Sequence, residues 1–348
     1  MAQDSLVRYA KQFRLAEIGE SGQRRLTLSS VAIVGCGALG SAVASTLVRA
    51  GVGAVRLIDR DFVEIDNLQR QFLYDEIDVA EQLPKAEAAA RKLHRVNSSI
   101  EIEPRVADLA ADNVDLLCRG VDLLIDGTDN LETRYLINDY AVKTEVPWVY
   151  GGCVGMEGLV LAVRPFETPC LRCFFPDPPP PGSLPTCETA GVFGPTVQLV
   201  AALQSAAAIR LLIGRLPVEL NTLQRVSAWG AMPRPLDASP ARCVAECTCC
   251  GQRQYEFLDR APGDAGWATL CGRDAIHLRP AKKSALSARD FAALSARLPS
   301  GAKPKYNEFL IRFETERCEV TLFADGRVIV KGTTDAAVAR KIHAAWVG

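Results

Sequence analysis

A glycine-rich loop stands near the start of the chain, in a setting that suits phosphate binding. Gly35, Gly37 and Gly40 form a GxGxxG pattern directly after the apolar run VAIV and at the start of an amphipathic stretch. Backbone N–H groups and the helix dipole at such a junction can bind a phosphate group. The same pattern occurs in sites for NAD and for ATP, so these glycines alone leave both nucleotides open.

Polar and basic side chains follow the loop. Asp59 ends the next apolar run, where a carboxylate can accept hydrogen bonds from ribose hydroxyls. The stretch DNLQRQF supplies Asn67, Arg70 and Gln71, and Lys85 begins a helical stretch after Pro84. A nicotinamide site has little use for two cations, whereas chemistry at phosphorus requires positive charge beside the phosphate oxygens. These residues favour ATP, although Arg70 and Lys85 taken singly are typical of solvated surface charges.

Two carboxylates end another predicted parallel strand, in the stretch LLIDGTDN. Asp126 and Asp129 would lie at the sheet edge where open α/β folds bind ligands. A carboxylate there can hold Mg²⁺ between phosphates, and we predict this role for Asp129, with Asn130 beside it in the nucleotide site. The alternative is that Asp129 is a turn residue or the N-cap of the following helix.

Cysteine spacing gives an independent signal. Cys170 with Cys173 and Cys247 with Cys250 form two CxxC pairs, and four thiolates in that arrangement suit tetrahedral Zn²⁺. Cys249 leaves a CxC pair with Cys247 as a second register, but CxxC better matches the first pair. The two pairs flank a proline-rich stretch and a helix, so we expect a structural zinc site, with redox-active pairs as the alternative.

Composition excludes several classes of partner. The chain has 348 residues, 48% of them hydrophobic, and 40 basic residues balance 41 acidic ones, so no positive excess argues for nucleic acid or an anionic membrane. The sequence shows no stretch of about 20 apolar residues, so we predict no membrane span. We therefore expect a cytoplasmic protein. In that reducing setting the 12 cysteines are ligands, reactive thiols or buried residues rather than a disulfide framework.

The elements that position these residues follow from hydrophobic periodicity. Apolar runs ending in Gly or Asp alternate with amphipathic stretches, which predicts an α/β fold of Rossmann-like type, with a mostly parallel sheet and crossover helices. The predicted strands of this sheet cover 31–35, 54–59, 100–107, 121–127 and 147–152. Further strands are expected at 156–165, 222–230 and 231–236, and a helix at about 192–214.

The same reading divides the chain into three parts. An N-terminal helical segment covers 1–28, and the nucleotide-binding domain covers 29–258, with an exposed proline-rich crossover loop at 174–191. A small α+β domain closes the chain over 265–348, with strand signals in TLCGRDAIHLRP, EFLIRFE and EVTLFADGRVIVKG and two helical stretches. We expect Cys271 and Cys318 in this domain to be buried small residues.

Taken together, these motifs resemble one family, the adenylylating enzymes of ThiF and MoeB type that activate ubiquitin-like proteins. The resemblance covers about residues 6–257 and rests on RYxxQ, GxGxxG, DNLQRQ, the Pro-Lys pair, GTDN, the CxxC pairs and TCETAG. It resolves the choice of nucleotide in favour of ATP. It implies that MgATP is surrounded by Gly37, Asp59, Asn67, Arg70, Gln71, Lys85 and Asp129.

The resemblance also implies a reaction. The C-terminal glycine carboxylate of a ubiquitin-like sulfur-carrier protein ending in Gly-Gly attacks the α-phosphate of ATP, giving an acyl adenylate and pyrophosphate. Cys187 in TCETAG matches the family's loop cysteine, which forms an acyl-linked adduct or takes part in sulfur transfer; an inert thiol is the alternative. No rhodanese-like extension is evident, so a separate donor such as a cysteine desulfurase would supply the sulfur.

In this family a basic residue of the N-terminal motif completes the site across a homodimer. Here RYAKQ places Lys11 at that position, with Arg14 nearby as the alternative. TCETAG and TLCGRDAI look more like the ThiF branch, which serves a ThiS-type carrier in thiamine thiazole synthesis, than the MoeB branch, which serves a MoaD-type carrier for molybdopterin. Two other classes stay open, an NAD-dependent oxidoreductase and a non-catalytic carrier-binding scaffold.

Overall fold

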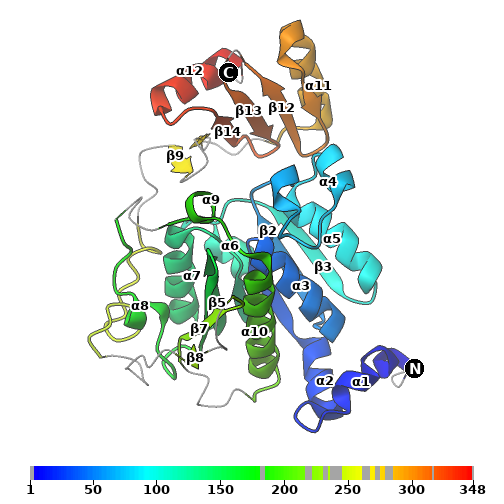
Figure 1. Cartoon of the computed structure of the whole chain (residues 1–348), viewed down its shortest axis with the longest axis vertical. Coiled ribbons are helices and arrows are strands. Elements are labelled where there is room, and N and C mark those ends of the chain that lie inside the picture. The colour runs from blue at the N-terminus through cyan, green and yellow to red at the C-terminus, as the bar shows by residue number, and fades with distance from the viewer. Residues whose placement is uncertain are drawn as a thin grey trace.

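Figure 1 shows the computed structural model of the chain. It describes residues 4–180, 185–215, 222–229, 234–235, 245–260, 267–270, 275–278, 285–315 and 317–346. These residues form a larger α/β part and, above it in the figure, a smaller part made from the C-terminal quarter of the chain.

The larger part is built on an eight-stranded sheet with the order β3-β2-β1-β4-β5-β6-β7-β8. The strands are β1 (Ser30–Val34), β2 (Ala54–Asp59), β3 (Glu101–Val106), β4 (Leu123–Asp126), β5 (Trp148–Val154), β6 (Glu157–Val163), β7 (Gln224–Ser227) and β8 (Arg234–Pro235). The first five pair in parallel and the last three add antiparallel strands. The predicted Rossmann-like class is confirmed.

Helices cover both faces of this sheet, which explains the unbroken apolar runs of its central strands. Val31 and Ile33 of β1 pack with α3 (Ala38–Ala50), α5 (Lys85–Val96) and α10 (Gly194–Leu212). Ala32 and Val34 face the opposite side, with α6 (Val114–Cys118) and α7 (Leu131–Thr144). Because parallel strands end at one edge, the loops after β1, β2 and β4 meet there.

The N-terminal segment lies at the opposite edge of the sheet. It comprises η1 (Asp4–Tyr9), α1 (Ala10–Phe13) and α2 (Gly19–Leu28), and α2 leads directly into the start of β1. The amide of Gln12 donates to the carbonyl oxygen of Ala50 at 2.8 Å, and the Tyr9 hydroxyl accepts from the Asn97 amide at 2.8 Å. These bonds hold the segment against the end of α3.

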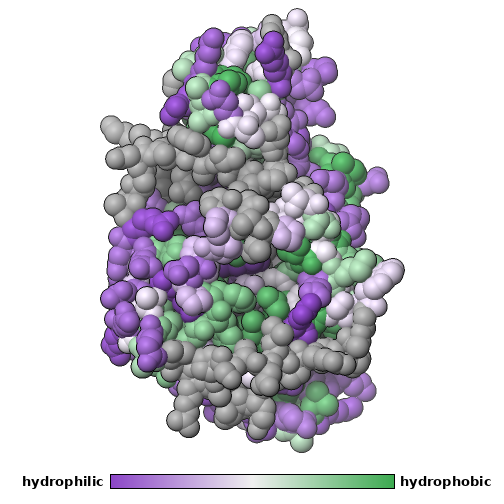
Figure 2. Space-filling model, turned by 60° about the vertical axis from the view of Figure 1, so that its left-hand side comes forward, coloured by the Kyte–Doolittle hydropathy of each residue, from purple (hydrophilic) through white to green (hydrophobic). Residues whose placement is uncertain are grey.

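Helix α10 corrects the expectation that no stretch of the chain is long and apolar enough to span a membrane. It is the 19-residue helix Gly194–Leu212, and by length and composition alone it could cross a membrane, with 44% of its apolar window buried. Its buried residues, including Val197, Val200 and Ala201, belong to the same core as β1 and α3. On the face shown in Figure 2, hydrophobic residues gather below the centre and hydrophilic residues line the left side.

The proline-rich crossover contains two short helices, α8 (Leu171–Phe174) and α9 (Cys187–Ala190). Residues 176–180 are in neither a helix nor a strand, and residues 181–184 lie outside the described residues. Three further short helices are η2 (Ile65–Asn67), α4 (Glu76–Ala80) and η4 (Ser300–Ala302).

The C-terminal part contains a six-stranded antiparallel sheet with the order β11-β12-β13-β14-β10-β9. Its elements are β9 (Trp267–Leu270), β10 (Ala275–Leu278), α11 (Ala288–Arg297), β11 (Lys305–Tyr306), β12 (Leu310–Glu314), β13 (Glu319–Phe323), β14 (Val328–Lys331) and α12 (Ala336–Trp346). The single strand signal in TLCGRDAIHLRP therefore spans parts of two paired strands. Cys318 is buried as expected, and Cys271 lies outside the described residues.

Candidate functional site

The three glycines of the loop have different physical reasons to be glycine. Gly35 has a φ of +88°, and a Cβ there would lie 2.7 Å from the backbone of Gly127. A Cβ on Gly40 would lie 1.7 Å from the carbonyl oxygen of Gly35. Gly37 is the N-cap of α3 with a φ of −73°, and its added Cβ would meet nothing closer than the Gln71 amide nitrogen at 3.9 Å. Packing thus explains Gly35 and Gly40, whereas the room beside Gly37 suits the approach of a ligand to the backbone.

Asp59 ties the glycine loop to the end of β2. One carboxylate oxygen accepts from the Cys36 amide at 2.6 Å, and the other accepts from the Asp61 amide at 2.7 Å. Burial raises the pKa of Asp59, while the positive charge of Lys85 opposes that rise. The carboxylate therefore lies within the field of the Lys85 ammonium group, as the sequence predicts for two residues of one site.

Lys85 is the first residue of α5 and is only 4% exposed. Its ammonium group lies 3.5 Å from the carboxylate of Asp61, and its backbone amide donates to the Asp61 carbonyl at 2.8 Å. The hydroxyl of Tyr74 donates to the Cys36 carbonyl at 2.6 Å and lies 3.1 Å from the carbonyl oxygen of Lys85. Tyr74, which sequence reasoning missed, thus links the glycine loop to the start of α5.

The DNLQRQF stretch forms η2 and the turn after it. The Asn67 amide donates to the Asp66 carboxylate at 2.8 Å, and Arg70 donates to the Asp66 carbonyl at 2.8 Å. Gln71 is 3% exposed, and its side-chain oxygen has no hydrogen-bond partner among the described residues. A buried acceptor without a partner costs about 1–3 kcal/mol, so a donor or cation supplied by a ligand would stabilise this position.

The two carboxylates at the end of β4 have different surroundings. Asp126 is fully buried, its carboxylate lies 3.1 Å from Arg134, and burial raises its pKa. Arg134 also donates to the Gly151 carbonyl at 3.3 Å, so this pair joins β4 to β5. Asp129 is exposed at the same edge. The N-cap of α7 is Asn130, which accepts from the Glu132 amide at 2.9 Å, so the capping alternative considered for Asp129 is wrong.

Lys11 and Arg14 are exposed on the N-terminal segment and do not join this site within the chain. Gln12 is bonded to Ala50 at the C-terminal end of α3, whereas the glycine loop precedes the other end of that helix. The helix has 13 residues, which corresponds to a length of about 20 Å. A contribution from either cation therefore requires a second copy of the chain.

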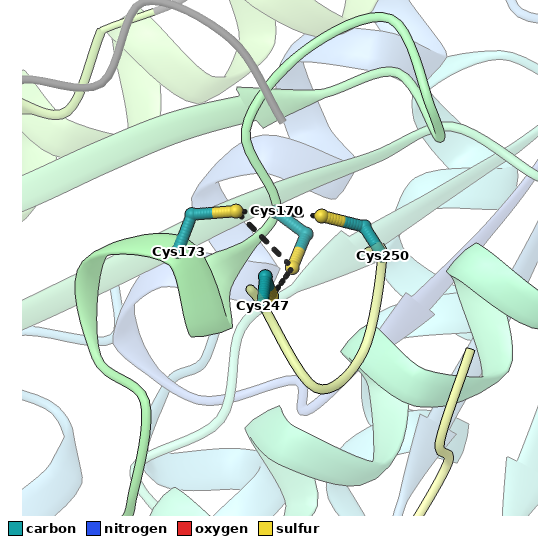
Figure 3. A group of neighbouring side chains, drawn as sticks. All are labelled: Cys170, Cys173, Cys247 and Cys250. Atoms are coloured by element: carbon teal, nitrogen blue, oxygen red, sulfur yellow. Dashed lines mark hydrogen bonds between the residues drawn. The ribbon is translucent and has the colours of Figure 1, made fainter. Parts of the chain in front are cut away.

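The cysteine pairs converge as predicted. Figure 3 shows Cys170 and Cys173, at α8, facing Cys247 and Cys250. The sulfur atoms of all four cysteines lie within 4.8 Å of one another. Hydrogen bonding from Cys170 lowers the pKa of the Cys247 thiol, which favours a thiolate. Cys249 is not one of these four residues, and its sulfur accepts a hydrogen bond from the Asn138 amide at 3.2 Å. The CxxC register is confirmed, and the cluster has the donor set of a tetrahedral metal site.

Arg172, between the first two cysteines, connects this cluster to the crossover loop. Its guanidinium donates to the Glu256 carboxylate at 2.8 Å and to the Pro176 carbonyl at 3.0 Å. The loop returns at α9, where the Gly155 amide donates to the Gly191 carbonyl at 2.9 Å beside the end of β5. Cys187 lies in the first turn of α9, and its side chain lies outside the described residues.

Comparisons with known proteins agree with this geometry. A family model described as ThiF family matches residues 9–247. A "Sulfur carrier protein ThiS adenylyltransferase" from Bacillus subtilis (strain 168) is 40% identical over 344 residues, which cover 98% of this chain and 99% of the relative. A "Sulfur carrier protein adenylyltransferase" from Thermus thermophilus is 42% identical over 217 residues, 61% of this chain and 79% of the relative.

Solved structures share the fold. A crystal structure of E. coli MccB with MccA-N7isoASN superimposes with a TM-score of 0.62 at 23% identity, covering 71% of this chain and 74% of that chain. At that level of identity the likeness concerns the fold alone.

Proposed function

The chain belongs to the ThiF family, and on this premise we propose that it adenylates the C-terminal glycine carboxylate of a ThiS-like ubiquitin-like sulfur carrier. The products are an acyl adenylate and pyrophosphate, and the adenylate prepares the carrier for thiocarboxylate formation in thiamine thiazole synthesis. The observation that carries the proposal is the 40% identity with the Bacillus subtilis ThiS adenylyltransferase over 98% of the chain.

The extent of that alignment favours the ThiS branch over the MoaD branch. The Bacillus subtilis relative, whose name specifies ThiS, aligns over 344 residues and so extends through the C-terminal part. The Thermus thermophilus relative, which aligns over 217 residues, is named for a sulfur carrier protein without specifying which one. A MoaD-activating enzyme is the second candidate within the same chemistry, because the nucleotide site would serve either carrier.

In the proposed nucleotide site the backbone of the glycine loop and the start of α3 receive phosphate oxygens. The room beside Gly37 lets the phosphates approach the amides, and Asp59 accepts hydrogen bonds from the ribose hydroxyls. Gln71 brings its partnerless side-chain oxygen to the same loop. Asn67 and Asn130 complete the lining of the pocket.

Two cations would then act on the reaction itself. Attack of the carrier carboxylate on the α-phosphate builds negative charge on the phosphate oxygens and on the departing pyrophosphate. Lys85 is buried beside Asp59 and Asp61, so its charge is held in a water-poor position where it acts strongly. Arg70 would release its bond to the Asp66 carbonyl to reach the same charge.

Two metal ions belong to the proposal. Asp129 would hold Mg²⁺, which when bound neutralises phosphate charge; Asp126 does not suit this role, because it is committed to Arg134. Zn²⁺ fits the four cysteines and would hold the two ends of the crossover region together.

Later steps involve Cys187 and other proteins. We assign to Cys187 the adduct or sulfur-transfer step, since α9 begins at this cysteine and follows the proline-rich loop. A separate protein such as a cysteine desulfurase would supply the sulfur. Because Lys11 lies at the far end of α3, we propose a homodimer in which it acts on the partner's phosphates.

Pyrophosphate exchange tests the reaction. With MgATP, the protein should exchange radiolabelled pyrophosphate into ATP only when a ThiS-like carrier with a free Gly-Gly carboxylate is added. Exchange without carrier, or none with a ThiS-like or a MoaD-like carrier, would contradict the proposal. Thermal stabilisation by NAD but not by MgATP would instead support an oxidoreductase, and nucleotide binding without turnover would support a carrier-binding scaffold.

A further inference from the structure

The C-terminal part contacts the segment that follows β2. The side chains of Phe62, Leu310 and Phe323 form a small buried cluster, with the two phenylalanine rings 6.5 Å apart between centroids. The guanidinium of Arg312 lies 4.8 Å from the centroid of the Phe62 ring, and the Lys331 ammonium lies 3.2 Å from the Glu64 carboxylate. This contact therefore combines apolar burial with charge pairing.

A second contact falls on the turn before α5. The side-chain amide of Asn307 donates to the carbonyl oxygens of both Glu81 and Gln82, each at 3.1 Å. Gln82 has a φ of +51°, in the left-handed region that a non-glycine residue adopts at a cost of roughly 1–3 kcal/mol unless its surroundings hold it there. Asn307 supplies part of that support from outside the α/β part.

These two contacted segments are paired with each other. The Val63 amide donates to the Leu83 carbonyl at 3.0 Å, and Phe62 and Pro84 form an antiparallel bridge. The pairing continues to Lys85, whose amide donates to the Asp61 carbonyl at 2.8 Å. A shift of the turn would therefore be transmitted directly to the residue that begins α5.

Glu64 connects the C-terminal part to η2 in a similar way. It is the N-cap of that helix, and its amide lies 3.4 Å from the side-chain oxygen of Asn67 in a reciprocal capping arrangement. Its carboxylate is the group that Lys331 contacts, with Arg312 at 3.9 Å. The C-terminal part thus contacts the turn that precedes Lys85 and the N-cap of the helix that contains Asn67. Both Lys85 and Asn67 are expected phosphate-binding residues.

We propose that the C-terminal domain is a positioning element of the nucleotide site, and that Asn307 is the residue through which it places Lys85. The inference rests on the proposed function, because it assigns to Lys85 a contact with the phosphates of ATP. It gives the C-terminal domain a role in nucleotide affinity that does not involve contact with the carrier.

The test uses the full-length protein with the substitution Asn307→Asp. The aspartate keeps the oxygen that accepts from the amides of Phe309 and Leu310, at 2.8 and 3.0 Å, but removes the donor to Glu81 and Gln82. Local structure in the C-terminal domain is thereby retained while the contact between the two parts is lost. Lys303→Ala is the matched control, because Lys303 pairs with Glu314 inside the same domain.

We expect Asn307→Asp to raise the KM for ATP in carrier-dependent pyrophosphate exchange by about ten-fold, since a displacement of 1 Å at a positioned group can cost up to about 100-fold. The KM for the carrier should not change, and Lys303→Ala should match the wild type. A purely structural role would reduce the amount of folded protein and so lower kcat, leaving the KM for ATP unchanged. An unchanged KM for ATP therefore overturns the inference.

Two additional measurements keep the result decisive. If Asn307→Asp does not fold, Phe323→Leu keeps an apolar side chain while removing the ring beside Phe62, and it should raise the KM for ATP in the same direction. If no carrier supports exchange, the proposed function fails, but the dissociation constants for MgATP of Asn307→Asp and wild type, measured by calorimetry without carrier, still decide the inference. Equal constants overturn it, and weaker binding by the variant supports it.

Discussion

Replacing Gly37 and Gly40 by alanine separates the part of the glycine loop that the fold needs from the part that a ligand needs. At Gly40 the new Cβ would lie 1.7 Å from the Gly35 carbonyl oxygen, a separation that real structures do not allow. At Gly37 the closest neighbour is the Gln71 amide nitrogen at 3.9 Å, and the φ of −73° lies outside the left-handed region that favours glycine. The two substitutions are chemically identical and lie three residues apart.

The distances set the expected magnitudes. Relieving the overlap at Gly40 requires α3 to move away from the loop, so we expect a loss of about 3 kcal/mol or more in the free energy of unfolding. Gly37→Ala should change that free energy by about 1 kcal/mol or less, the usual scale for an N-cap substitution. In the complex, however, its methyl group would occupy the space through which phosphate reaches the amides. Losing such preorganised backbone contacts costs roughly 100-fold in rate.

The assay combines thermal unfolding with carrier-dependent pyrophosphate exchange. Gly37→Ala should unfold within a few degrees of the wild type, with exchange reduced by about 100-fold. Gly40→Ala should lose stability and exchange together. Near-normal exchange by a well-folded Gly37→Ala protein would refute the assignment of this loop to phosphate. Strong destabilisation of Gly37→Ala would show that the open space beside Gly37 has been misjudged.

Three further outcomes test other parts of the site. About one zinc per chain should be found by elemental analysis, and Cys173→Ser should release it and lower the unfolding temperature, because metal binding is coupled to folding; a metal-free protein of full stability would contradict this. Asp129→Asn should abolish exchange by removing a charged ligand of Mg²⁺, so near-normal exchange would remove Asp129 from the site. Cys187→Ala should leave exchange nearly intact but slow thiocarboxylate formation, and normal formation would show that Cys187 has no chemical role.

The parallel part of the fold is predictable because its signal is local. A strand covered by helices on both faces must be largely apolar along its length, so runs such as 31–35 and 121–127 reveal β1 and β4 without any knowledge of their partners. Four thiols with CxxC spacing are equally explicit, because the chemistry of a metal site restricts which residues it uses. The parallel strands and the convergence of the four thiols are both confirmed in the structure.

Roles that depend on tertiary partners are less predictable. Asp126 ends β4 and Asp129 follows it, and nothing in the sequence shows that Arg134 reaches back to pair with Asp126. The N-cap of α7 is Asn130, one residue after Asp129. The sequence does not decide between the two, because Asp and Asn side chains both suit an N-cap. The contact of Asn307 with residues 81 and 82 joins segments more than 200 residues apart, as the separations of 226 and 225 residues record. No local pattern announces such a contact.

The N-terminal motif RYAKQ combines two roles, because some of its side chains anchor the segment and another is exposed. Tyr9 and Gln12 face inward, where they bond to Asn97 and Ala50 and fix the segment to the end of α3. Their anchoring leaves Lys11, between them in the sequence, exposed at the edge of the sheet opposite the glycine loop. A flexible side chain reaches only a few ångströms, while the helix between the two ends is about 20 Å long. If the charge of Lys11 acts on ATP, it acts on the ATP bound by another chain, and the anchor is what presents it there.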